Sequence, residues 1–228
     1  MSWQDVALKW EKFEDLEDYL KTQLENFSEK EKEEAFYAPL EFGTAGMRGI
    51  VGPGINRMNI YTVRQATEGL ARLIETYGEE AKKRGVAIAH DSRHFSPEFA
   101  LESAKVLVKH GIKAYVFEDL RPTPELSYAV RHLHTFAGIM ITASHNPAAY
   151  NGYKVYGEDG GQMPPKDADA LTEFVRQVEN PLAVDVVTKE ELEQSALFEW
   201  IGEAVDASYL EEIKSVSVNP ALLSNTKD

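Results

Sequence analysis

The sequence predicts a three-layer α/β/α domain, in which a parallel β-sheet lies between two layers of helices. Short apolar runs and helix-forming segments alternate through the middle of the chain. The apolar runs are 86–89, 114–117 and 138–141. Helices are predicted between them, beginning near Ser96 and Thr123, because each of these residues is followed by a proline that suits the first helical turn. A β-α-β-α-β order makes the strands parallel, with right-handed crossovers and helices on the faces.

The N-terminal segment is predicted to form one amphipathic helix, since apolar residues recur every three or four positions from Trp3 to Leu24. The charged stretch 28–34 is predicted to be a solvated helix face or a linker without a binding role. A glycine-rich loop at 43–49 and a strand come next. A capping-box pattern that starts at Thr62 then opens a helix to about residue 77.

The last third of the chain is predicted to contain one strand and several helices, at 152–156 and then at 165–178, 190–194 and 207–215. We expect residues 1–200 to form an N-terminal α/β domain. Residues 201–228 are expected to be a linker and the start of a second domain, whose remainder lies outside this sequence.

Composition limits the partners of the chain. The 228 residues carry 24 Lys plus Arg against 38 Asp plus Glu, a net charge of -14, which disfavours nucleic acid and anionic membrane surfaces. There is no Cys, so disulfides and thiolate chemistry are excluded. The N-terminus lacks the pattern of a secretory signal, and we expect a cytoplasmic protein without nucleic-acid or membrane partners.

Ser144 is the candidate nucleophile, because it follows the third predicted strand at the sheet edge where ligands of such folds bind. His145 is adjacent to it, and Lys154 follows a second turn through which the chain can double back. A cation at Lys154 would favour a phosphate dianion. Taken alone, the loop also fits a simple turn, since Ser and Asn before Pro are common turn residues.

The loop 43–49 is a candidate phosphate cradle, because it offers unobstructed backbone amides and the guanidinium of Arg48. A surface turn with an adjacent arginine is the alternative. The spacing matches neither a Walker A motif nor a dinucleotide fingerprint. Ser144 lacks the Gly-x-Ser-x-Gly context of an acyl hydrolase, and no His and Asp cluster of a two-metal serine phosphatase surrounds it.

Together these segments resemble the signature loops of the α-D-phosphohexomutases, and most of all the phosphoglucomutase branch with its bacterial and phosphopentomutase-like members. The resemblance covers roughly residues 40 to 165, with the motifs in family order. The segments that carry it are Gly43-Thr44-Ala45-Gly46-Met47-Arg48-Gly49, His90-Asp91-Ser92-Arg93-His94-Phe95-Ser96, Arg121-Pro122-Thr123-Pro124, Thr142-Ala143-Ser144-His145-Asn146-Pro147 and Tyr150-Asn151-Gly152-Tyr153-Lys154.

The resemblance implies the first-domain fold of this family, with a mostly parallel mixed sheet, and a phosphoserine at Ser144. In the family this serine exchanges a phosphoryl group with a sugar monophosphate, interconverting glucose 1-phosphate and glucose 6-phosphate through glucose 1,6-bisphosphate. Arg48 would steady the phosphate, Lys154 would supply charge and is a candidate for proton transfer, and His145 would have a supporting or acid–base role. The expected phosphate- and substrate-binding residues are Thr44, Arg48, Ser144, His145, Asn146 and Lys154.

The resemblance also implies Mg²⁺, bound by Ser144 through its phosphate and by Asp ligands of a second domain that this sequence lacks. Asp167 and Asp169 imitate that Asp motif, but they fall in a predicted helix and are expected to face solvent. The implied partners are sugar phosphates and the remaining domains of the same enzyme. Phosphomannomutase, phosphopentomutase and a non-catalytic structural fragment remain alternatives, and the isolated chain is expected to be inactive.

Overall fold

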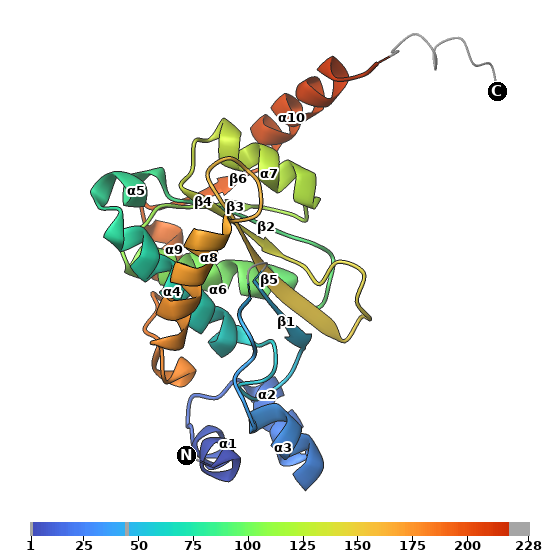
Figure 1. The fold of residues 1–228 in the computed structure, drawn as a ribbon, viewed down its shortest axis with the longest axis vertical. Helices are drawn as coiled ribbons and strands as arrows, with labels where there is room; N and C mark the ends of the chain where they lie inside the picture. The colour runs from blue at the N-terminus through green and yellow to red at the C-terminus, as the bar shows by residue number, and fades with distance from the viewer. Residues whose placement is uncertain (1, 44–45, 219–228) are drawn as a thin grey trace, which may run out of the picture.

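The structure is a computed structural model that describes residues 2–43 and 46–218, and its centre is a six-stranded mixed sheet in the order β1-β5-β4-β2-β3-β6 (Figure 1). The strands are β1 (Met47–Ile50), β2 (Val86–His90), β3 (Ala114–Phe117), β4 (Ala137–Ile141), β5 (Tyr150–Tyr156) and β6 (Phe198–Ile201). Four of them, β4, β2, β3 and β6, run parallel, whereas β5 and β1 are antiparallel to their neighbours. The predicted mostly parallel mixed sheet is confirmed.

Helices cover both faces of this sheet, as predicted. The helices on one side are α4 (Ile60–Thr76), α6 (Ser96–Lys109), α8 (Pro165–Arg176) and α9 (Lys189–Gln194), and those on the other are α7 (Thr123–His132) and α10 (Glu203–Ser215). Short elements α5 (Glu79–Arg84) and η1 (Pro181–Ala183) connect them. Strand β2 shows the two-sided burial, because Ile88 packs in the α4 and α6 core while Ala87 and Ala89 pack in the α7 core.

The N-terminal segment forms three helices, α1 (Trp3–Glu11), α2 (Asp18–Glu25) and α3 (Glu29–Phe36), so the prediction of one helix to Leu24 is wrong. The helix breaks between α1 and α2, where the hydroxyl of Tyr61 donates to the carbonyl of Asp15 at 2.8 Å and accepts the N–H of Glu17 at 3.2 Å. A buried side chain from α4 thus satisfies backbone groups that a continuous helix would have paired internally.

Helix α3 confirms the prediction for the charged stretch. Ser28 caps it, and Ala35 and Phe36 are its buried residues. The core between these helices and α4 is aromatic, with Trp10 packed edge-on against Phe36 and Tyr61.

Two helix starts differ from the predicted ones. The cap of α4 is Asn59, whose side-chain oxygen accepts from the N–H of Tyr61 and of Thr62, so Thr62 is the third helical residue instead of the cap. Ser96 is the first residue of α6, and the preceding Phe95 has a positive φ of 64°. The hydroxyl of Ser96 donates to Asp91 and therefore does not cap the helix.

Strand β6 was not predicted. It lies beside β3 in parallel register, from Ala114 opposite Phe198 to Phe117 opposite Ile201. Helix α10 then runs outward from the body of the molecule (Figure 1). Its first turn is bound to the loop before α7 through Arg121 and Asp206, with N···O distances of 2.7 and 2.8 Å. Within the described ranges, no helix is long and apolar enough to cross a membrane.

Candidate active site

Ser144 lies in the loop that joins β4 to β5, at the carboxyl end of β4, and its side chain is exposed. Its φ of 56° is uncommon for a residue other than glycine. Its N–H donates to the hydroxyl of Thr142 at 2.9 Å, and the preceding Ala143 is fully buried. The loop is therefore anchored in the core immediately before the residue that presents its hydroxyl to solvent.

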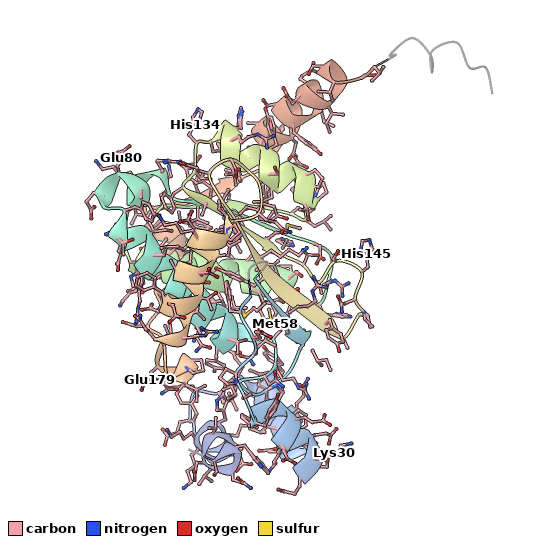
Figure 2. The ribbon with its side chains drawn as sticks, in the orientation of Figure 1. Lys30, Met58, Glu80, His134, His145 and Glu179 are labelled. Atoms are coloured by element: carbon pink, nitrogen blue, oxygen red, sulfur yellow. The ribbon has the colours of Figure 1, made fainter. Side chains whose placement is uncertain are left out.

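His145 is the polar group nearest in sequence to this hydroxyl, and its Nδ1 lies 3.1 Å from Ser144 Oγ. The imidazole is exposed and points away from the body of the molecule (Figure 2). The geometry allows a proton to pass between the ring and the hydroxyl, because the separation is that of a hydrogen bond.

Asn146 connects this loop to β1. Its side-chain oxygen accepts a hydrogen bond of 2.6 Å from Nη1 of Arg48, and its N–H donates to the carbonyl of Ala143 at 3.1 Å. Arg48 is exposed and stands opposite Gly152 in the pairing of β1 with β5. The guanidinium is thus held at the serine loop with other donors still available.

Lys154 lies two residues beyond Gly152 on β5, so its side chain leaves the sheet on the same face as that of Arg48. Burial lowers the pKa of the Lys154 amine, the nearby charge of Arg48 lowers it further, and Asp91 opposes both effects. Among the described residues, neither Arg48 nor Lys154 has a carboxylate within ion-pair distance. Two cations without such a partner favour an anionic ligand at this face.

The glycine-rich loop approaches β5 very closely. Gly46 has a φ of 100°, and a Cβ there would lie 1.9 Å from the carbonyl oxygen of Tyr153. Gly43 and Gly46 exchange two backbone hydrogen bonds of 2.9 Å. The loop is thus packed against β5 immediately before β1 begins, one residue before Arg48. Thr44, predicted to bind phosphate, lies outside the described residues.

Arg93 is a further residue of the site that was not among the predicted ones, although it lies in a segment that carries the family resemblance. It follows β2 and donates to the carbonyls of Ser144 at 2.9 Å and of Asn146 at 2.7 Å. The sequence signal that could have identified Arg93 is its position two residues after Asp91, at the carboxyl end of a buried strand. This end of the sheet is the edge that carries Ser144.

The described residues do not form a magnesium site by themselves, since no group of three or more acidic or His side chains converges in them. Asp169 is exposed on α8, as predicted, whereas Asp167 is half-buried. The cations beside Ser144 fit a phosphate and not an isolated metal ion. A magnesium site would need the serine phosphate together with acidic ligands from elsewhere.

Comparison with known proteins shows the family of the chain. Residues 39–181 match the family model "Phosphoglucomutase/phosphomannomutase, alpha/beta/alpha domain I". A phosphoglucomutase of Staphylococcus saprophyticus is 40% identical over 88% of this chain and 35% of its own length. A phosphoglucomutase of Staphylococcus aureus is 44% identical over 71% of this chain and 29% of its own length. The chain thus spans about a third of the length of the curated relatives that it matches.

Solved structures share the fold. A provisionally assigned phosphomannomutase of Thermus thermophilus is 30% identical with a TM-score of 0.59, covering 78% of this chain and 36% of that one. The open form of parafusin, a phosphoglucomutase of Paramecium, is 16% identical with a TM-score of 0.57 over 80% of this chain and 36% of that one, a likeness of fold alone. The chain belongs to the phosphoglucomutase/phosphomannomutase family.

Proposed function

We propose that this chain is the phosphoserine-bearing first domain of a phosphoglucomutase, which interconverts glucose 1-phosphate and glucose 6-phosphate. The observation that carries the proposal is the exposed Ser144 hydroxyl on a fixed loop, 3.1 Å from His145 and joined through Asn146 to Arg48. The names of the Staphylococcus relatives support the choice of sugar.

The proposed reaction consists of two phosphoryl transfers, which move two different phosphoryl groups. A hydroxyl oxygen of the sugar monophosphate attacks the phosphorus of phosphoserine 144, the bond from phosphorus to Ser144 Oγ breaks, and glucose 1,6-bisphosphate forms. The sugar hydroxyl loses a proton and Ser144 Oγ gains one. In the second half, Ser144 Oγ loses its proton and attacks the other phosphate of the bisphosphate, and the bond from that phosphorus to the sugar oxygen breaks. The sugar oxygen gains a proton, the phosphoserine is restored and the isomeric monophosphate is released. The transition state gains from fixed cations around the phosphoryl oxygens.

Each of the proposed site residues has a separate task in this scheme. The 3.1 Å contact supports His145 as the group that exchanges a proton with Ser144 Oγ. The lowered pKa of Lys154 favours its neutral amine and supports it as the group that accepts the proton of the sugar hydroxyl, which makes it a cation beside the phosphoryl group. Arg48 binds phosphoryl oxygens with the donors that Asn146 leaves free. Thr44 is proposed as a further phosphate ligand.

The rest of the proposal concerns parts outside this chain. Remaining domains of the same enzyme would supply the sugar contacts and the Asp ligands of Mg²⁺, and the ion would neutralise phosphoryl charge when bound. We place the first domain at residues 1–200 and the enzyme in the cytoplasm. Phosphomannomutase is the second candidate activity, because the family model covers both enzymes. Phosphopentomutase and a structural fragment without turnover stay open.

The test is Ser144→Ala in the full-length enzyme, assayed with glucose 1-phosphate and a trace of glucose 1,6-bisphosphate. Ser217→Ala, at an exposed serine just beyond the end of α10, is the matched control. We expect full activity in the control, and none in S144A at unchanged thermal stability. Retained turnover in S144A would refute the nucleophile. Comparison of kcat/KM for glucose, mannose and ribose 1-phosphates decides the sugar, and sustained release of inorganic phosphate would indicate a phosphatase instead.

A further inference from the structure

The guanidinium of Arg93 binds four backbone carbonyls of the Ser144 loop. Nη1 donates to the carbonyls of Pro147 and Tyr150, both at 2.9 Å. Nη2 donates to those of Ser144 at 2.9 Å and Asn146 at 2.7 Å. These acceptors span the loop from the nucleophile to the first residue of β5, so one side chain ties both ends of the loop together.

Arg93 is itself fixed to the sheet and to α6. Its N–H donates to Oδ1 of Asp91 at 2.9 Å, and its Nε lies 3.4 Å from Oδ2 of the same carboxylate. Oδ1 of Asp91 also accepts from the hydroxyl of Ser96 at 2.9 Å. That hydroxyl accepts in turn from the amide of the fully buried Asn151 on β5, at 2.9 Å. The network links the ends of β2, α6 and β5 to the loop.

The four N–H donors of the two Nη atoms of Arg93 are all bound to backbone carbonyls, and Nε lies at ion-pair distance from Asp91. The side chain is only 14% exposed. The terminal fork that would bind a phosphate is therefore fully used within the protein, in contrast to Arg48, which uses one nitrogen for Asn146. Arg93 is therefore placed to hold the loop, whereas Arg48 can bind the ligand.

The contact with the Ser144 carbonyl matters for the direction of the Ser144 side chain. Ser144 has a positive φ of 56°, which is a sparsely populated conformation for a serine. Its N–H is held by Thr142 and its carbonyl by Arg93. With both backbone groups bound, the peptide planes on either side of Ser144 are fixed, and so is the direction in which Cβ and Oγ leave the backbone.

We infer that Arg93 is a positioning residue for phosphoryl transfer at Ser144: it fixes the direction of Oγ through the loop carbonyls and does not contact the sugar phosphate. This inference rests on the proposed function. Lysine cannot substitute for it, because an ammonium offers three donors on one atom and cannot span four carbonyls as the planar fork of arginine does.

The experiment compares Arg93→Lys with Arg84→Lys in the full-length enzyme. Arg84 is the matched control, since it also donates to two backbone carbonyls, those of His134 at 2.9 Å and Thr135 at 3.1 Å, and pairs with Glu158 far from the serine loop. We expect R93K to lower kcat roughly 100-fold, as a misplaced reacting group does, and to change KM by less than about threefold. R84K should keep the activity of the wild type.

Hydrogen exchange gives a readout that does not depend on turnover. The N–H groups of Ser144, Asn146 and Tyr150 all donate within or beside the loop. In R93K these amides should exchange at least about tenfold faster than in the wild type, while the amides of α4 keep their protection. Thermal stability of both variants completes the comparison.

Unchanged kcat in R93K would overturn the inference. So would a loss of kcat that appears equally in R84K or that disappears after correction for the folded fraction, because either result would show a general structural role. A rise in KM alone would also overturn it, since that result indicates contact with substrate. A wild-type enzyme that is inactive on sugar phosphates would instead refute the proposed function. The assay of the wild type alone gives this result, so it is distinguished from a failure of the inference about Arg93.

Discussion

Replacing Gly152 by alanine perturbs the fold at the point where three strands support the serine loop. Gly152 pairs with Arg48 across β1 and with Thr142 at the end of β4. A Cβ at this position would lie 2.6 Å from the carbonyl oxygen of Thr142 and 3.0 Å from that of Met47. Both neighbours are backbone atoms of adjacent strands, so they cannot turn aside as a side chain would.

The strands must therefore separate to restore normal contact distances. Overpacking of this kind costs about 1 to 3 kcal/mol in the free energy of unfolding. For a chain of this size that corresponds to a fall of roughly 2 to 12 °C in melting temperature. Because Thr142 precedes Ser144 by two residues, the same shift moves the hydroxyl, and kcat should fall by up to about 100-fold.

The assay is thermal unfolding of the variant together with kcat of the full-length enzyme. Gly157→Ala is the matched control, because its nearest neighbour, Oδ1 of Asp159, would lie 3.4 Å from the new Cβ, an ordinary contact. We expect the control to be near neutral. A Gly152→Ala protein with wild-type stability and kcat would show that the close packing of β1, β5 and β4 does not support the site.

Three further predictions concern charged and polar side chains. Lys154→Met should lower kcat about 10²- to 10⁴-fold with little change in KM, measured by steady-state kinetics, and a change in KM alone would remove its role in the transition state. Asn146→Ala frees the guanidinium of Arg48 and should lower kcat/KM about 10-fold, whereas Asn180→Ala, at a distant turn, should not. Glu125→Gln should stabilise the chain at pH 8 by roughly 1 to 3 kcal/mol but not at pH 5, measured by urea unfolding. The reason is that burial beside Asp206 raises the pKa of Glu125 from 4.5 to about 7, so the stability that its proton contributes is fully present below about pH 4.5 and is lost as the pH rises through 7. Equal stability of wild type and E125Q at pH 8 would contradict this reasoning.

The central strands were predictable because their signal is local. Residues 86–89, 114–117 and 138–141 are short apolar runs between helix starts, and they became β2, β3 and β4 within a residue or two. Strand β6 was missed because its four residues include two exposed positions in an acidic segment, and only its pairing with β3 defines it. The break between α1 and α2 depends on the hydroxyl of Tyr61, a contact over more than 40 residues.

The candidate site shows the same division between local and distant signals. The position of Ser144 after a buried strand follows from the α/β pattern, and the motif resemblance led to Arg48 and Lys154. Arg93 was not assigned, because its partners are backbone carbonyls, and the sequence does not show where a loop turns its carbonyls. Asn146 was among the expected phosphate-binding residues, but its hydrogen bond to Arg48, which is 98 positions away in the sequence, becomes visible only in the folded chain.

The most direct test of the central claim is the site of phosphorylation after incubation of the full-length enzyme with glucose 1,6-bisphosphate and Mg²⁺. Trypsin cleaves after Arg131 and Lys154, so Ser144 falls in peptide 132–154. We predict an added mass of about 80 Da on this peptide, assigned to Ser144 by fragmentation and absent from Ser144→Ala. A phosphate on another residue, or an unmodified peptide 132–154 in an enzyme that still interconverts the sugar phosphates, would contradict the assignment of Ser144 as the phosphoryl carrier.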